Sequence, residues 1–455
     1  MILRHLFLIV FALVTCGSVA NFIRADVPFS IRGPGVNPSD FRMTTFASGL
    51  NYPVGMVELS DGSVMVAVSN GSSFFGSDSG SLIRLADTDG DGVADEQNIL
   101  ADNVPGGGLS SLRMIDDLIF ATGQGNGRPI SIYRAGKNPS SPVSKVGEIS
   151  INYALSWLHP HSALGVRKTP GSADSYDLVF QLGSRTNFDD TNGSLRLRSD
   201  IGVSGRVAGD SIHMITITDD GKNIAGSDLR QIATGLRNAA GFAFDSETGD
   251  LYIQDNGIDG VTNPNEPTSA DELNVLSFAE IGGEVEDYGF PDNYHEYRTN
   301  RVVGGSGVQP LVVFQPIPSP RGAEAEGPND IALAPPSFPE ALRNGLFIGM
   351  HGRFSLGGTK NEENPLVFVD LNDQSYFHFI ENDEPDIGHL DGLLSTRDSL
   401  FVADLSPRGG FSGSNRNTGT VYQIKSLVPE PSSWALGLLG VWLIALSYPP
   451  LRSAS

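Results

Sequence analysis

The sequence predicts an all-β protein in which one β-hairpin signature recurs along the chain. Each copy is a strand that alternates apolar and polar residues, a tight turn rich in Asp and Gly, and a second alternating strand, which is the pattern of antiparallel hairpins. The turns are separated by about 55 to 95 residues, a repeat that favours propeller blades. We therefore predict a six-bladed β-propeller with four antiparallel strands in each blade. The six copies span residues 54–67, 107–123, 162–183, 240–255, 329–349 and 386–404.

Further alternating runs supply partner strands between the hairpins, and they begin at Gly80, Arg128, Ser211, Pro365 and Gly419. The widest spacing follows the fourth hairpin, so we place an insertion at about Ile258–Ala325, between the fourth and fifth repeats. A β-sandwich would leave six copies of one hairpin unexplained. No long amphipathic helix is apparent, so we expect little helix.

The composition excludes several classes of function. The chain has 455 residues, 53 acidic and 30 basic, and a formal net charge of −23. Because phosphate binding needs a basic face, we expect no nucleic-acid partner. The acidic balance suits an exported protein or one that binds cations. The single cysteine, Cys16, rules out a disulfide framework, a Cys-ligated zinc site and a cysteine nucleophile.

Residues 1–25 have the pattern of a secretory signal peptide. A basic start at Arg4 and His5 precedes the apolar stretch Leu6–Val14, and small residues at Ala20 and Ala25 offer cleavage sites. We therefore expect export, with a mature propeller domain at residues 26–427.

Residues 428–455 form a separate C-terminal signal. Pro429-Glu430-Pro431 precedes the apolar or small segment Trp434–Ser447, and Arg452 follows. This segment is shorter than the roughly 20 residues of a comfortable membrane span, so it reads as a short transmembrane segment or a docking helix. The pattern resembles the PEP-CTERM sorting signal. The resemblance implies an exosortase-type processing protease as partner, membrane contact only through this tail, and a place in the periplasm, outer surface or extracellular matrix of a Gram-negative-type bacterium.

Several strings in the second half resemble the glucose/sorbosone dehydrogenase family. They are Thr234–Phe244 (TGLRNAAGFAF), Thr248–Tyr252 (TGDLY), Asp255–Gly257 (DNG), Asp271–Asn274 (DELN) and Tyr288–Pro291 (YGFP). The resemblance spans about Gly49 to Lys425. It implies a six-bladed propeller that oxidises sugars with pyrroloquinoline quinone (PQQ) and calcium as cofactors.

The resemblance makes His159 the candidate catalytic base, because this histidine stands five residues before Leu164, as the family's catalytic histidine does. Such a base takes the hydroxyl proton of the sugar while hydride leaves the anomeric carbon. His161 is the close competitor, and a histidine satisfied within a loop is the alternative for either. Leu158 stands where the family commonly has an acidic residue or glycine, which predicts a less basic imidazole.

The pair Arg237 and Asn238 matches the family's Arg-Asn pair at the quinone, which implies catalytic and cofactor-binding roles. An arginine offers a planar fork to a carboxylate, and an asparagine is both donor and acceptor. A polar turn at the entry to a strand is the alternative. Arg353, Lys360 and Arg408 are candidates, by position only, for further basic side chains that bind the quinone.

The resemblance also implies calcium sites. Gly257 and Ile258 fall where family members lend backbone carbonyls to the calcium of the cofactor. Asp271 and Glu272 correspond to a carboxylate pair beside a second calcium ion.

An acidic loop supplies an independent calcium signal. Carboxylates stand at positions 1, 3, 5 and 9 of an EF-hand-like loop with Gly at position 6, while position 12 is Asn98 rather than a glutamate. An acidic hairpin turn is the alternative. The four predicted ligands are Asp87, Asp89, Asp91 and Asp95.

Together these features predict an exported PQQ- and calcium-dependent aldose dehydrogenase-like oxidoreductase whose substrate is a carbohydrate. One alternative is a non-catalytic cell-surface or matrix propeller that binds polysaccharide or protein. Another is a calcium-dependent lactonase-type propeller with acids around one axial metal, although no set of four residues in the sequence assigns such a site.

Overall fold

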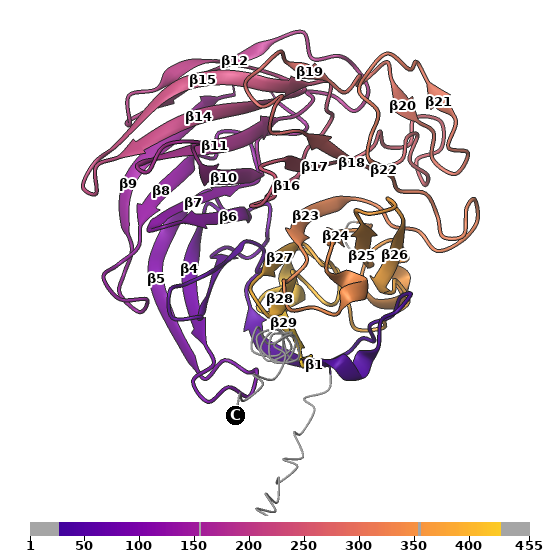
Figure 1. Ribbon diagram of the computed structural model, residues 1–455, viewed down its shortest axis with the longest axis horizontal. Coiled ribbons are helices and arrows are strands. Elements are labelled where there is room, and N and C mark those ends of the chain that lie inside the picture. The colour runs from indigo at the N-terminus through magenta and orange to yellow at the C-terminus, as the bar shows by residue number, and fades with distance from the viewer. Residues whose placement is uncertain (1–26, 154–155, 354–355, 429–455) are drawn as a thin grey trace, which may run out of the picture.

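The computed structural model describes residues 27–153, 156–353 and 356–428, and these residues form an all-β fold. The strands make six sheets of at least four strands that are arranged in a ring, with one small two-stranded sheet beside them (Figure 1). The prediction of a six-bladed propeller is confirmed. The predicted signal peptide and the C-terminal sorting segment lie outside the described residues, apart from Val428. Within the described ranges, no helix is long and apolar enough to span a bilayer.

The inner strand of each blade faces the axis, and each inner strand contacts the inner strand of the next blade until the last returns to the first. The inner strands are β2 (Met56–Glu58), β6 (Leu109–Ile115), β10 (Leu164–Lys168), β16 (Gly241–Phe244), β23 (Pro328–Leu333) and β27 (Gly392–Ser395). The second strands are β3 (Val64–Ser69), β7 (Leu118–Gly123), β11 (Ser175–Leu182), β17 (Leu251–Asp255), β24 (Gly345–Met350) and β28 (Ser399–Asp404). Each predicted hairpin therefore forms the first two strands of one blade.

Every residue of the six second strands is buried. These strands lie between an inner strand and a third strand of their own sheet and between the faces of two neighbouring blades, so both of their faces are covered. The third strands are β4 (Ser79–Ala86), β8 (Ile130–Arg134), β14 (Ser211–Asp219), β18 (Glu272–Leu276), β25 (Leu366–Asp370) and β29 (Gly419–Ser426). The fourth strands are β5 (Glu96–Pro105), β9 (Ser144–Asn152), β15 (Ile224–Thr234), β22 (Val312–Val313), β26 (Tyr376–Ile380) and β1 (Phe41–Leu50).

The last blade closes the ring with the first strand of the chain. Strand β1 pairs antiparallel with β29, from Phe41 opposite Ser426 to Leu50 opposite Gly419. The sequence analysis did not identify β1. Two irregularities in its register, between Thr45 and Ala47 and near its end, interrupt the simple alternation on which a strand prediction depends.

The predicted insertion at 258–325 is interrupted by two strands of the fourth blade, β18 and β22. The inserted residues therefore form three pieces, before β18, between β18 and β22, and after β22, and the second piece carries β19 (Glu286–Asp287), β20 (Tyr294–His295) and β21 (Val302–Val303). A further extension was not predicted. Strands β12 (Ser194–Ser199) and β13 (Ser204–Ala208) leave the third blade and extend the sheet of the second blade through β9.

The loops that precede the inner strands and the loops that join second to third strands lie at one end of the ring, because neighbouring strands of a blade are antiparallel. We call this end the entry face. His159 precedes β10, Arg237 precedes β16, and the loop from Asn256 to Asp271 joins β17 to β18. The predicted site residues of the third and fourth blades therefore share the entry face.

Candidate functional site

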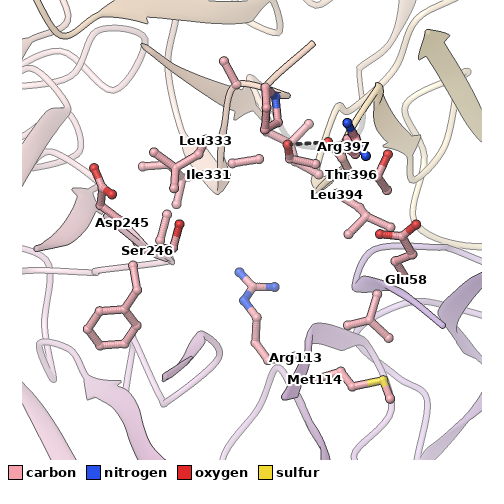
Figure 2. A pocket seen from close by; sticks show the side chains of 18 of the residues that line it. Glu58, Arg113, Met114, Asp245, Ser246, Ile331, Leu333, Leu394, Thr396 and Arg397 are labelled. Carbon is pink, nitrogen blue, oxygen red and sulfur yellow. Dashed lines mark hydrogen bonds between the residues drawn. The ribbon is translucent and has the colours of Figure 1, made fainter. Parts of the chain in front are cut away.

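A large cavity lies at the opposite end of the ring, where the inner strands end. Its volume is about 1090 Å³, and residues of all six inner strands contribute to its wall. Figure 2 shows the side chain of Arg113 extending into its middle, and this guanidinium pairs with Asp330 at 2.7 Å. None of the predicted site residues lines this cavity, so cavity size does not locate the predicted chemistry.

His159 lies at the entry face in a defined orientation. Its backbone N–H donates to the carbonyl of Ser184 at 3.0 Å, and its Nδ1 lies 2.8 Å from the Ser184 hydroxyl. That hydroxyl donates its single proton to the carbonyl of Thr186 at 2.6 Å. Nδ1–H must therefore donate to Ser184, which leaves Nε2 unprotonated and able to accept a proton.

The imidazole of His159 is neutral because burial, together with the charge of Arg237, lowers its pKa to about 2. His161 has a different environment. It is fully buried, its Nδ1 lies 2.8 Å from the Tyr153 hydroxyl, and its ring stacks on the Tyr153 ring. Since His161 reaches no solvent, its position suits a structural role, and His159 is the better candidate for a base.

Arg237 and Asn238 are held by Asp255, the last residue of β17. The two oxygens of this carboxylate accept the backbone N–H groups of Arg237 at 2.9 Å and of Asn238 at 2.6 Å. The guanidinium of Arg237 is almost fully buried, donates to the carbonyl and side-chain oxygens of Asn187, and pairs with Asp259 at 2.7 Å. Asp259 is 71% exposed. The buried arginine therefore already binds a carboxylate at the edge of solvent.

One backbone hydrogen bond joins the histidine and the arginine. The N–H of Ser184 donates to the carbonyl of Arg237 at 2.7 Å, while Ser184 also contacts His159 through backbone and side chain. The structure thus brings these two predicted residues into one cluster on the third and fourth blades.

Three carboxyl groups lie close to Arg237, and Asp255 and Asp271 among them are buried. Burial raises the pKa of Asp255 to about 7, of Asp271 to about 6 and of Glu272 to about 8. Asp271 accepts the N–H groups of Gly257 at 2.7 Å and Gly327 at 2.8 Å. Arg237 is the cation whose charge lowers the pKa of Asp255 and Asp271. When all three groups are ionised, the set carries more negative than positive charge, and a bound cation would favour that state.

A small cavity adjoins Asp255 and Glu272 and has a volume of about 20 Å³, room for one water or one ion. Its wall includes Arg237, Asp255, Gly257, Ile258 and Glu272. The carbonyl of Ile258 accepts the N–H groups of both Thr268 at 2.7 Å and Ser269 at 3.3 Å, so both of its lone pairs are engaged. The side-chain oxygen of Asn256 is buried without a hydrogen bond. Oxygen donors around an excess of negative charge fit a calcium ion.

Comparison with known proteins shows the fold. The AA12 carbohydrate-active enzyme of Trichoderma reesei has a TM-score of 0.58 and 16% identity, over 90% of this chain and 99% of that chain. The PQQ domain of pyranose dehydrogenase from Coprinopsis cinerea has a TM-score of 0.55 and 14% identity, over 87% and 97%. The PQQ-bound aldose sugar dehydrogenase of Streptomyces coelicolor has a TM-score of 0.52 and 16% identity, over 86% and 100%.

The fold is the six-bladed propeller of these sugar dehydrogenases. No protein-family model matches the chain, and no curated protein matches it either. At such identities the likeness establishes the fold, whereas the function has to be argued from the site.

The predicted acidic loop joins β4 to β5, outside the inner strands. Carboxylate oxygens of Asp87, Asp89 and Asp95 lie within 4.8 Å of one another. Asp91 does not belong to this group, and its carboxylate accepts the N–H of Val93 at 2.8 Å. Asp87 accepts the N–H groups of two glycines, Gly90 and Gly92, as an acidic turn also would. Calcium binding by this loop stays a prediction.

None of the three positional candidates for holding the quinone has a hydrogen bond or ion pair to His159 or Arg237 among the described residues. Arg353 pairs with Glu363 at 2.8 Å and donates to the carbonyl of Asn265, while Lys360 and Arg408 are exposed. Sequence reasoning also missed Ser184 and Asn187, which orient His159 and Arg237. Both lie in the loop after β11, where no motif distinguishes them. Asp255 belongs to the string Asp255–Gly257 of the family resemblance. Its place at the end of a predicted second strand is the signal that could have identified its role in holding Arg237 and Asn238.

Proposed function

We propose that this chain is an exported calcium- and PQQ-dependent sugar dehydrogenase acting at the entry face. The observation that carries the proposal is the cluster of His159, Arg237 and nearby carboxyl groups in a propeller whose structural neighbours include PQQ-bound sugar dehydrogenases. The substrate class is an aldose or a related carbohydrate.

The residues present fit both cofactors. Asp255 and Glu272, with the side-chain oxygen of Asn256 and the backbone carbonyl of Gly257, would hold calcium, because the small cavity that these residues line is the size of one ion. Arg237 would hold a carboxylate of PQQ in place of the exposed Asp259. When bound, PQQ supplies an ortho-quinone that accepts hydride from the sugar.

His159 would take the proton of the sugar hydroxyl at Nε2, since Nδ1 is committed to Ser184. The charge of Arg237 is one reason for its low pKa. A carboxylate bound to Arg237 would offset that charge and so raise the proton affinity of the imidazole. Asn238 would orient the cofactor or the substrate.

Reconstitution tests this proposal. The purified protein is mixed with PQQ and calcium and supplied with a panel of aldoses and an artificial electron acceptor. We expect turnover that requires both cofactors. Binding of PQQ without turnover of any sugar would reject the dehydrogenase.

A second candidate is a non-catalytic surface propeller that binds polysaccharide or protein. It is favoured by the engagement of Arg237 with Asn187 and Asp259 and by the very weak basicity of His159. Saturable glycan binding that is independent of PQQ, in a protein without turnover, would select it.

Export and surface sorting complete the proposal. The N-terminal signal would direct secretion, and an exosortase-type protease would remove the tail at 428–455. A calcium ion in the loop of Asp87, Asp89 and Asp95 would stabilise the first blade without taking part in catalysis. The lactonase alternative gains no support from the described acidic groups, because neither includes a residue of the six inner strands.

A further inference from the structure

A second group of acidic side chains lies where the residues inserted into the fourth blade meet the fifth blade. One carboxylate oxygen from each of Glu324, Glu326 and Glu363 lies within 4.8 Å of the other two. Oxygen ligands on opposite sides of a calcium ion are about 5 Å apart, since each lies at about 2.4 Å from the ion. The spacing of this group, which we call the glutamate cluster, is therefore that of a coordination shell.

The arginines beside the cluster neutralise only part of its charge. Arg298 pairs with Glu266 at 2.7 Å and also with Glu324, and Arg353 pairs with Glu363 at 2.8 Å. Among the described residues, Glu326 forms no ion pair with a lysine or arginine. Two guanidinium groups thus face four carboxylates, which leaves an excess of two negative charges when all four are ionised.

Two buried polar atoms point to a missing ligand at the same place. The Oε1 atom of Glu326 is buried without a hydrogen bond, and so is the hydroxyl of Tyr297, whose side chain is only 7% exposed. That hydroxyl faces Glu326 without reaching hydrogen-bond geometry, and burial, the charges of Glu326 and Glu324 and the contact with Glu326 raise the pKa of Tyr297. Buried polar groups without partners are costly, so their convergence with three carboxylates requires an explanation.

We propose that Glu324, Glu326 and Glu363 bind a divalent cation of the calcium class, with the Tyr297 hydroxyl directed at its ligand shell. An all-oxygen donor set selects a hard cation. The excess of two negative charges equals the charge of one such ion, and the ion supplies a partner for both orphaned atoms.

The position of the ion gives it a structural role. Tyr297 belongs to the segment that carries β20 and β21, which Figure 1 shows beside the fourth blade, whereas Glu363 precedes β25 of the fifth blade. The ion therefore fastens the inserted segment to the next blade. It also steadies Asp271 of the candidate site, because Gly327, the neighbour of Glu326, donates to Asp271. The inference does not depend on catalysis.

Protonation is the competing way to remove the excess charge. Burial and the charges of Glu363, Asp271 and Glu324 raise the pKa of Glu326 to about 9, so without an ion this side chain holds a proton at neutral pH. Glu326→Gln copies the protonated acid in shape and charge, which lets one variant separate the two explanations.

The test counts bound calcium by calorimetry in metal-stripped full-length protein and in three variants. Glu326→Gln should bind one calcium ion fewer than the wild type, and the exposed control Glu340→Gln should bind the same number. Calcium bound by the acidic loop could mask the loss of one ion from the glutamate cluster. Glu326→Gln is therefore also combined with Asp87→Ala/Asp89→Ala, which removes the ligands of that loop. An equal count in the wild type and Glu326→Gln would overturn the proposal and leave a protonated glutamate.

Two further readouts locate the ion. Calcium should protect the inserted segment of the wild type from limited proteolysis but not that of Glu326→Gln, and protection that persists in the variant would contradict the proposal. Terbium bound at the site should emit when Tyr297 is excited, and Tyr297→Phe should lose that component. Unchanged emission would place the ion elsewhere. Neither readout uses sugar oxidation, so failure of the proposed enzyme and failure of this site are separable.

Discussion

At the scale of single residues, the chemistry of the candidate site depends on which nitrogen of His159 carries the proton. Ser184 has one hydroxyl proton and gives it to Thr186, so it must accept from Nδ1 of the imidazole. Nε2 is then the only atom of His159 that can act as a base. His161 has the same residue type two positions later, but its full burial removes it from any substrate.

This difference predicts the ranking of two substitutions. His159→Gln keeps a polar side chain of similar size but no basic nitrogen, so kcat of the reconstituted enzyme should fall by about 10²-fold or more while PQQ still binds. His161→Gln should lower thermal stability more than kcat per folded molecule. Steady-state kinetics with PQQ titration, beside thermal melts, measure both. The opposite ranking of kcat would transfer the role of base to His161.

At the scale of elements, two blades have the same arrangement at the entry face, an aspartate that ends the second strand and accepts backbone N–H groups. In the fourth blade, Asp255 at the end of the second strand accepts two backbone N–H groups of the loop before the inner strand. In the sixth blade, Asp404 ends the second strand and accepts the N–H groups of Gly388 and His389. A carboxylate at this position ties two loops that are distant in sequence, which explains why acidic side chains are buried there.

The acidic loop between β4 and β5 should link calcium to stability. A ligand that binds only the folded state stabilises it by about 2.7 kcal/mol at a hundredfold excess over Kd. Asp87→Ala/Asp89→Ala should remove the part of the calcium-induced rise in Tm that belongs to this loop. Melting curves with calcium and with chelator measure it. A rise in Tm that is unchanged in the double variant would identify the loop as an acidic turn.

The closing strand β1 should be indispensable. Phe46 of β1 is 3% exposed and packs edge-on against Phe401 of β28 with ring centroids 5.0 Å apart. Phe46→Ala should cost about 3–5 kcal/mol of unfolding free energy, because it leaves a cavity where the chain ends meet. Ile99→Ala, at a site 60% exposed on β5, should cost little. Denaturant titrations of both variants check this, and equal losses would mean that closure does not limit stability.

At the scale of the whole molecule, burial in the ring shapes the pH dependence of stability. Burial raises the pKa of Asp404 to about 7, well above the value near 4 of an exposed aspartate. A carboxyl group whose pKa is raised by folding contributes stability below about pH 4, and that contribution is lost as the pH rises through 7.

The wild type should therefore lose stability between about pH 4 and pH 7 through this group. Asp404→Asn cannot ionise and should show a shallower decline over the same interval. Unfolding free energies at a series of pH values, with chelator present throughout to exclude effects of calcium, give the comparison. Parallel curves for the two proteins would show that Asp404 does not cause the decline.

The amino-acid sequence by itself determined the repeating unit of this protein. Strand alternation and turn residues are local properties, and they located all six inner hairpins, while the string around Arg237 and Asn238 marked part of the entry-face cluster. Tertiary structure alone decided how the ring closes through β1 and which imidazole nitrogen of His159 is free. It also decided that Glu324, Glu326 and Glu363 meet. The physical reason is that strand pairing across the ends of the chain, burial and charge balance depend on residues far apart in sequence, whose proximity no local pattern records.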